Sequence, residues 1–154
     1  MAKFSVELPK DVMDEIDKRV KDTPKMMEEM TKAGAEVVYQ NVIRNMKGSF
    51  KDSSKLEPYL KITKTYRTFS DDAINTKVAF YGYYKPETKT FTKKGKGGQS
   101  YTYNGVPVPL IVMAREYGTS SGEQKKPFMR KSFRKNQIEK AMMSVQDKYI
   151  KDGD

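Results

Sequence analysis

The chain contains no cysteine and no histidine among its 154 residues. Without cysteine it forms neither disulfides nor thiolate nucleophiles, and nothing in it requires an oxidising compartment, which favours synthesis inside the cell. Without histidine it lacks the commonest general base and metal ligand, and with them every Ser-His-Asp or Cys-His arrangement. Most hydrolase mechanisms are therefore excluded, and we expect no catalytic residue, no metal site and no cofactor.

Long hydrophobic runs are missing as well. The longest, Val106–Ala114, is less than half of the roughly 20 residues that span a bilayer, and Pro107 and Pro109 interrupt it. At the N-terminus, Glu7 and Pro9 stand where a secretory signal would need its apolar segment. We therefore expect a soluble protein with no signal peptide and no membrane partner.

Positive charge is what the chain has in excess. Its formal net charge is +10 and its pI is about 9.6, which favours an acidic partner such as nucleic acid, or acidic neighbours in an assembly. Lysine supplies most of this charge, and its flexible ammonium suits attraction to phosphates without reading of base sequence. The length fits a single domain, 1–154, with one core.

Apolar residues spaced about 3.6 residues apart predict two helices in the N-terminal part of the chain. The first covers Pro9–Lys21. The second covers Pro24–Lys47, because Thr23 is a good N-cap, proline is a good first helical residue and Gly48 is a stop signal. Methionines of the second helix fit either the core or an adaptable binding surface. These are Met26, Met27, Met30 and Met46.

After Gly48 the pattern changes to alternation, which predicts β-strands. Two strands, 59–65 and 74–81, are expected to join around Ser70–Asp72. Two further β-prone runs, Thr88–Thr92 and Ser100–Asn104, flank a Lys/Gly-rich segment with the composition of a hairpin tip. The sequence thus predicts a small antiparallel sheet with an extended basic hairpin.

Two more helices complete the predicted α+β fold. Pro109 begins a short helix, and Gly118 can end it in the left-handed conformation. One face of this helix carries Leu110, Met113, Ala114 and Tyr117. The last helix is predicted from Pro127 to about Lys151, with an apolar stripe opposite a basic face. The stripe consists of Met129, Phe133, Ile138, Ala141, Met142, Val145 and Tyr149, and the basic face of Arg130, Lys131, Arg134, Lys135 and Lys140. The basic face fits either solvent exposure or DNA contact.

Two motifs resemble functional sites but have commoner structural interpretations. Gly95–Gly98 lacks the strand, the helix and the Ser or Thr of a P-loop, so it more often forms a hairpin tip. Nearby lysines could still neutralise nucleic-acid phosphates without reading sequence. They are Lys93, Lys94 and Lys96. Asp71 and Asp72 have no further metal ligand close in sequence, and such a pair more often forms a turn.

The segment around Glu116 leaves two questions open. Glu116 and Tyr117 would form an acid–base pair if they lay in a cleft, but neighbours on a helix point about 100° apart, which favours a structural or interface carboxylate. Phe128, at the predicted start of the last helix, fits either the core or a contact with another protein. Met129 has the same two interpretations.

Two short motifs separated by a polar loop resemble a known family. Glu116-Tyr117-Gly118-Thr119, followed by Pro127-Phe128-Met129-Arg130 and a charged amphipathic helix, is similar to the signature of the small tail-component family of long-tailed bacteriophages. Upstream, Ala33–Val38 resembles the alanine- and glycine-containing helix of that family, and Ser53–Leu56 resembles its Thr-Gly-Arg-Leu turn, with Ser54 in place of the glycine. The segment 85–107 resembles a basic hairpin inserted into the family's pattern.

The resemblance implies a subunit of the phage neck with no active site. Such a tail-completion protein would assemble as a ring, with six copies usual, between the portal-side head-completion connector and the tail-tube or tail-terminator protein. Its place would be the virion, after synthesis in the host cytoplasm. The residues expected to serve fold and assembly are Glu116, Tyr117, Gly118, Thr119, Pro127, Phe128 and Met129. DNA would pass through the lumen of the ring without sequence-specific contact, near Lys93, Lys94 and Lys96.

Two alternatives remain at this stage. The subunit could be the tail terminator that caps the tail tube. From another class, it could be a nucleic-acid-binding protein without sequence specificity that uses the basic hairpin and the last helix. An enzyme is a third interpretation, which would require a cleft around Glu116 or Asp71.

Overall fold

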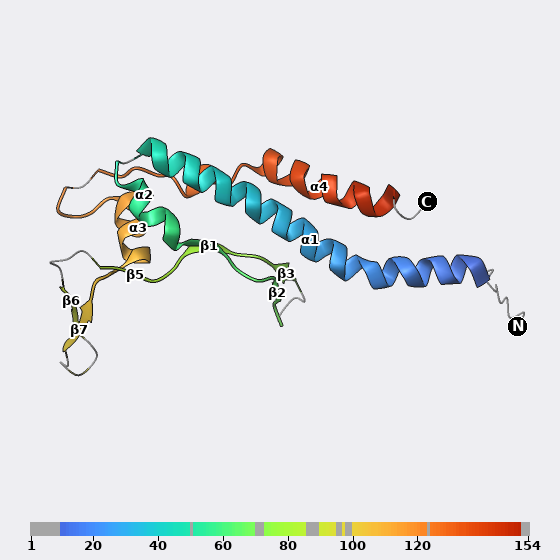
Figure 1. Ribbon diagram of the computed structural model, residues 1–154, viewed down its shortest axis with the longest axis horizontal. Coiled ribbons are helices and arrows are strands. Elements are labelled where there is room, and N and C mark those ends of the chain that lie inside the picture. The colour runs from blue at the N-terminus through green and yellow to red at the C-terminus, as the bar shows by residue number, and fades with distance from the viewer. Residues whose placement is uncertain are drawn as a thin grey trace, which may run out of the picture.

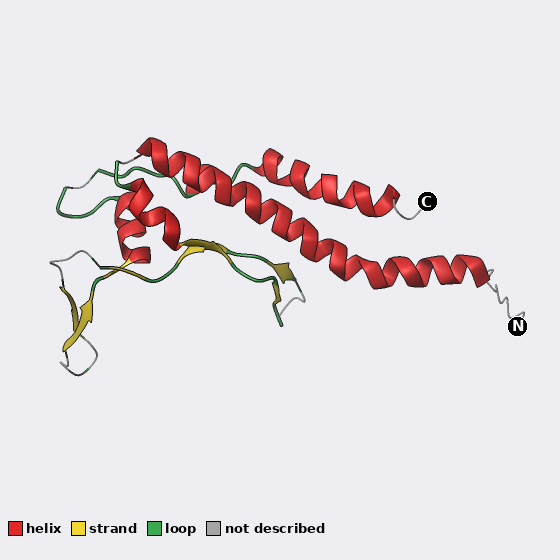
Figure 2. Cartoon of the chain, in the orientation of Figure 1, coloured by secondary structure: helices red, strands yellow, loops and turns green. Residues whose placement is uncertain are grey.

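A single long helix, α1 (Lys10–Ser49), organises the molecule. The computed structural model describes residues 10–49, 51–69, 73–85, 90–94, 97, 100–122 and 124–151. The last helix, α4 (Lys135–Lys151), lies along one side of α1, and the short strands and α3 (Val108–Tyr117) lie on the other side (Figure 1). Helices and short antiparallel strand pairs together make a mixed α and β fold (Figure 2).

The prediction of two N-terminal helices is wrong. α1 runs through Pro24 without a break, and Thr23 lies inside the helix instead of capping a new one. A proline in a helix interior removes one backbone hydrogen bond and bends the axis, at a cost of about 3 kcal/mol, but it does not require the helix to end. The axis of α1 changes direction within its N-terminal half in Figure 1, as an internal proline produces.

A short link leads from α1 to the first strands. It contains α2 (Ser53–Leu56) and the 3₁₀ turn η1 (Glu57–Tyr59). The two predicted strands 59–65 and 74–81 are confirmed as an antiparallel pair, but it is interrupted in its middle. The part farther from residues 70–72 pairs β1 (Leu60–Ile62) with β4 (Val78–Phe80). The part nearer to them pairs β2 (Tyr66–Arg67) with β3 (Ile74–Asn75). The expected turn at residues 70–72, including Asp71 and Asp72, lies outside the described residues.

The second predicted hairpin is also present, with a shifted strand. β6 (Thr90–Lys94) pairs with β7 (Ser100–Asn104), and at its base β5 (Tyr83–Tyr84) pairs with β8 (Val106–Pro107). Lys93 and Lys94 were expected in the loop, but they belong to β6, opposite Tyr101 and Ser100. This hairpin stands away from the helices in Figure 1.

The predicted helix from Pro127 to Lys151 begins later than expected. Residues 124–128 are irregular, a 3₁₀ turn η2 covers Arg130–Ser132, and α4 begins only at Lys135. The predicted apolar stripe is therefore confirmed only for its members within α4. Phe133 precedes α4 and has 59% of its surface exposed, whereas the helical members of the stripe are half-buried against α1. These members are Ile138, Ala141, Met142, Val145 and Tyr149.

The core lies where the C-terminal half of α1 meets the strands and α3. Val42, Met46, Val108 and Phe128 are fully buried at its centre. The other buried members are Val38, Leu56, Leu60, Phe80 and Val112. Of the methionines predicted as core or binding surface, Met46 is core and Met27 is 43% exposed. Gly34 lies where α1 and α4 approach closely, because a Cβ there would stand 3.1 Å from Cγ2 of Ile138.

Candidate functional site

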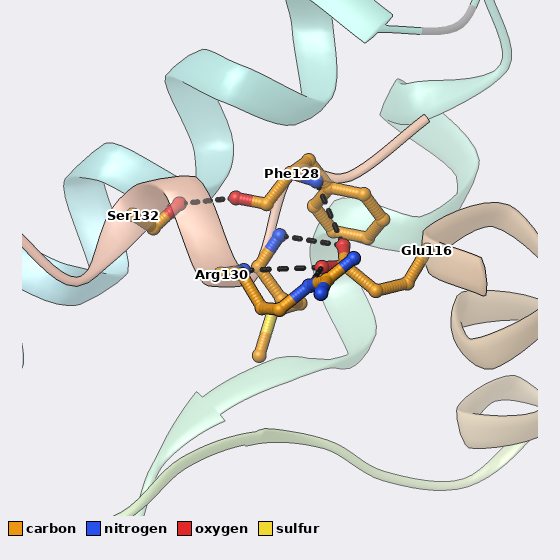
Figure 3. Close-up of polar contacts among 5 residues, drawn as sticks. Glu116, Phe128, Arg130 and Ser132 are labelled. Carbon is orange, nitrogen blue, oxygen red and sulfur yellow. Dashed lines mark hydrogen bonds and ion pairs between the residues drawn. The ribbon is translucent and has the colours of Figure 1, made fainter. Parts of the chain in front are cut away.

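The two motifs separated in sequence meet at a buried carboxylate. Glu116, in the last turn of α3, is 3% exposed, and its side chain reaches the segment that starts at Phe128 (Figure 3). Oε2 accepts the backbone N–H of Phe128 at 2.7 Å and that of Met129 at 2.9 Å. Oε1 accepts the backbone N–H of Arg130 at 3.2 Å and its Nε–H at 3.1 Å. We call this cluster, Glu116 with Phe128, Met129 and Arg130, the Glu116 joint.

The hydrogen bonds at the joint decide the charge state of Glu116. Burial raises the pKa of this carboxyl group, but the three backbone N–H donors and the Arg130 guanidinium favour the ionised form and bring the pKa below its ordinary value. The carboxylate therefore stays charged near neutral pH, with both oxygens occupied. A general base would need a free oxygen facing a substrate, so this geometry fits a structural role and does not fit the acid–base interpretation.

Tyr117 and Gly118 surround the joint from the end of α3. The Tyr117 ring is 60% exposed, and the Arg130 guanidinium carbon lies 5.3 Å from its centroid, within cation–π range. Arg130 thus bridges Glu116 and Tyr117. Gly118 ends α3 as predicted, with its N–H bonded to the carbonyl of Ala114, but its φ of 81° and ψ of 177° lie outside the left-handed helical region. That combination is essentially restricted to glycine.

The loop between the motifs is tied back to α3. Thr119 Oγ1 lies 2.9 Å from Ser121 Oγ, and the backbone N–H of Lys126 donates to the carbonyl of Arg115 at 2.8 Å. The latter bond brings Pro127 to the joint. Pro127 is half-buried and precedes η2 in an irregular segment, so it does not begin a helix as expected.

The question about Phe128 has a clear answer within this chain. Its side chain is fully buried, and its ring meets the Phe80 ring edge-on, with centroids 6.3 Å apart and planes at 80°. Phe128 is therefore a core residue of the subunit. Met129 is half-buried and packs on the edge of the same core.

A buried polar network beneath the joint was not predicted from the sequence. Asn41 Nδ2 donates to the carbonyl of Ser132 at 3.2 Å and to Oε1 of Gln137 at 2.9 Å. Asn45 Nδ2 donates to Ser132 Oγ at 2.9 Å, and that hydroxyl donates to the carbonyl of Phe128 at 2.6 Å (Figure 3). The available signal was the i, i+4 spacing of two asparagines beside the apolar face of α1.

This network explains why the last helix starts late. Within a continuous helix the carbonyl of Ser132 would accept an N–H from four residues ahead. Here it accepts Asn41 Nδ2 and the N–H of Arg134, and Phe133 adopts φ −82° and ψ 76°, which is not helical. Side chains of α1 therefore hold the chain in a 3₁₀ turn at a position where the local pattern favours a helix.

An exposed apolar face lies on α3, beside the joint. The face predicted from the sequence exists, but it points away from the core, since Val108, Val112 and Glu116 are the buried residues of α3. Leu110 is 44% exposed, Met113 56% and Tyr117 60%. We call these three residues the α3 outer face.

The predicted phosphate-contacting lysines are only partly described. Lys93 and Lys94 lie in β6, whereas Lys96 falls outside the described residues. Lys93 and Lys94 thus belong to a different element from the Glu116 joint, which α3 and residues 128–130 form. Among described residues no group of three or more metal-binding side chains occurs, and no described helix has the length and apolarity needed to cross a membrane.

Comparisons with known proteins identify no relative of this chain. No family model matches the chain, and searches of curated proteins and of solved structures found no match.

Proposed function

We propose that this chain is a structural protein of a phage virion, a tail-completion subunit that forms a hexameric ring in the neck. In this role it joins the portal-side connector to the tail tube or the tail terminator, and DNA passes through its lumen. The resemblance of the two sequence motifs to the phage tail-component family motivates the proposal. Those motifs supply both halves of the Glu116 joint, so the residues that carry the resemblance also carry a structural role.

The observation that carries the proposal is the α3 outer face. Leu110, Met113 and Tyr117 are at spacings of three and four residues, so they share one side of α3 and form an apolar surface that the described part of the chain leaves exposed. Contiguous exposed apolar surface commonly marks a contact with another protein. Because Tyr117 is also linked to the joint through Arg130, the joint fixes the position of this surface relative to the core.

The total exposed surface supports assembly as well. The chain exposes 12079 Å² at a mass of 17.7 kDa, whereas a compact monomer of that mass exposes about 8,000 Å². A subunit in a ring buries surface against two neighbours, at roughly 800 Å² for each standard contact. The elongated shape in Figure 1 leaves room for both.

Electron microscopy of the purified protein and of virion necks tests the proposal. We expect closed rings in solution or on the neighbouring neck proteins, and copies of this chain in purified virions. Leu110→Glu combined with Met113→Glu should abolish ring formation, because two charges on the α3 outer face would have to be buried. Phe69→Glu is the matched control, since Phe69 is a fully exposed apolar residue in the β2–β3 hairpin. A protein that stays monomeric with its neighbours present and never enters virions would refute the proposal.

A nucleic-acid-binding protein outside the virion is the second candidate. The observation in its favour is the solvent-exposed row of cations along η2 and α4, which includes Lys131, Arg134 and Lys140. Virion content separates the two candidates, because only the neck protein is built into the particle. Absence of duplex binding at low salt would remove the second candidate.

A further inference from the structure

A basic groove lies where the C-terminal end of α1 meets the last turn of α3. It has a volume of about 450 Å³, and its walls come from three separate parts of the chain: the end of α1 and the link after it, the last turn of α3, and the loop before Pro127. The lining residues are Lys47, Gly48, Ser49, Lys51, Asp52, Arg115 and Lys126. None of them is among the residues that the sequence singled out for phosphate contact.

The described side chains that line the groove carry a net positive formal charge. Four cations and one carboxylate line it, which gives a formal charge of +3. Lys47 pairs with Glu57 at 3.3 Å and Asp52 pairs with Lys55 at 3.1 Å, so counting these two partners leaves +3. The C-terminus of α1 adds a negative partial charge of about half a unit, far too little to neutralise the cations.

Two of these cations are available to a ligand. Lys51 and Lys126 are exposed, and among the described residues neither ammonium has an ion-pair partner. They come from segments 75 positions apart in sequence, and both line the same groove. The hydrogen bond between the N–H of Lys126 and the carbonyl of Arg115 holds the Lys126 segment beside the end of α3. The fold therefore gathers like charges in one depression, which costs electrostatic energy unless an anion binds there.

The lining also identifies the class of anion. Sites for small organic ligands are mostly apolar with a few polar groups, whereas every side chain lining this groove is charged, polar or absent. Open, lysine-lined surfaces of this kind attract phosphodiester backbones, because lysine neutralises phosphates without demanding a fixed geometry. A single free phosphate would meet only part of the groove.

We propose that this basic groove binds the phosphate backbone of a nucleic acid, with Lys51 and Lys126 each neutralising one phosphate. The site does not depend on the ring proposal, because it is a property of one subunit. In a neck ring it would mark a surface that faces DNA. In a free nucleic-acid-binding protein it would be a contact in addition to the exposed cations of η2 and α4.

Salt-dependent binding of a fluorescent mixed-sequence DNA duplex, followed by anisotropy, tests the groove. Log affinity of the wild-type protein should fall linearly with log salt, and the double variant Lys51→Gln, Lys126→Gln should lower the slope by about 1.8, at 0.9 per phosphate. When salt rises from about 50 to 200 mM, the double variant should therefore lose roughly tenfold less affinity than the wild type. The control, Lys25→Gln with Lys32→Gln, removes the same charge from exposed positions of α1 well before its C-terminal end and should leave the slope close to wild type.

Two results would overturn the proposal that this groove binds a nucleic-acid backbone. An equal slope change in the α1 control would show that only total charge matters. Thermal stabilisation by inorganic phosphate at matched ionic strength, dependent on Lys51 and Lys126 but without duplex binding, would assign the site to a free phosphate. Circular dichroism melts of both double variants should match the wild type, because the substituted side chains are exposed. Ring formation and duplex binding are measured separately. A groove variant that still forms normal rings but no longer binds the duplex would show that the two proposals can fail independently.

Discussion

The Glu116 carboxylate accepts the N–H of Phe128 at 2.7 Å, and this bond ties the end of α3 to the residue whose ring fills the centre of the core. The backbone of Phe128 thus makes a polar contact with Glu116, while its side chain packs in the apolar core. The same carboxylate holds Met129 and Arg130, so loss of one side chain should loosen the whole corner.

Removal of the Glu116 side chain should destabilise the subunit strongly. Glu116→Ala leaves three backbone N–H groups without their acceptor, so we expect a loss of about 3 kcal/mol in the free energy of unfolding. Glu116→Gln keeps one acceptor oxygen and should lose less. Urea denaturation measures both. Glu139→Ala, which breaks only the exposed pair with Lys135, should change stability by less than about 0.5 kcal/mol and serves as the control.

Acid should weaken the joint in a way that depends on Glu116. Because the folded pKa of this carboxyl lies below its unfolded value of about 4.3, its contribution to stability is complete above that value and disappears as pH falls through the folded pKa. The stability difference between wild type and Glu116→Gln should therefore shrink below about pH 4. Denaturation curves at pH 6, 5, 4 and 3 test this, and a difference that stays constant across the series would contradict it.

Truncation of Phe128 should unfold the subunit before it affects assembly. Phe128→Ala removes a fully buried ring, for an expected cost of about 3–5 kcal/mol. Phe133→Ala, at an exposed ring close by, should stay within about 0.5 kcal/mol. A double-mutant cycle of Phe80→Leu and Phe128→Leu should give a coupling energy of about 0.5–1.5 kcal/mol for the edge-on pair. A stable Phe128→Ala monomer that no longer assembles would favour the interface interpretation.

Gly34 should tolerate a methyl group and reject a larger side chain. A Cβ would lie 3.1 Å from Ile138 and 3.4 Å from Met142, so Gly34→Ala requires a small displacement of α4. The higher helix propensity of alanine offsets this cost by up to about 1 kcal/mol. Gly34→Leu should separate α1 from α4 and cost about 1–3 kcal/mol. Thermal melts measure both. Gly48→Ala, where a Cβ meets nothing within 4 Å, reports propensity alone.

Local patterns in the sequence predicted the elements that depend on local chemistry. The two strand pairs, the short helix before Gly118 and the α+β composition are present, because alternation, helical periodicity and a terminating glycine act over a few residues. The end of the second predicted helix near Gly48 is also close to the observed end of α1 at Ser49. The predicted break at Pro24 failed because a good first helical residue is also tolerated, with a bend, inside a long helix.

The Glu116 joint needed the tertiary structure. The sequence placed Glu116, Tyr117 and Phe128 in the candidate site, but neither the direction of the carboxylate nor the burial of the ring follows from spacing. Periodicity identified one face of α3 and could not say whether that face points inward, and the structure shows that it points outward. Such orientation depends on which face packs on α1 and the strands, a choice made by residues far away in sequence.

By itself, then, the sequence determined that histidine and cysteine chemistry is excluded and what kind of element forms in most segments, because residue types and local periods do not depend on distant contacts. Only the tertiary structure decided that Asn41 and Asn45 interrupt the last helix at Ser132, that Lys51 and Lys126 share one groove, and that Glu116 is saturated with donors. These are contacts between segments separated by up to about 90 residues. Their formation depends on how the whole core packs, because the free energy of any one contact is too small to fix it alone.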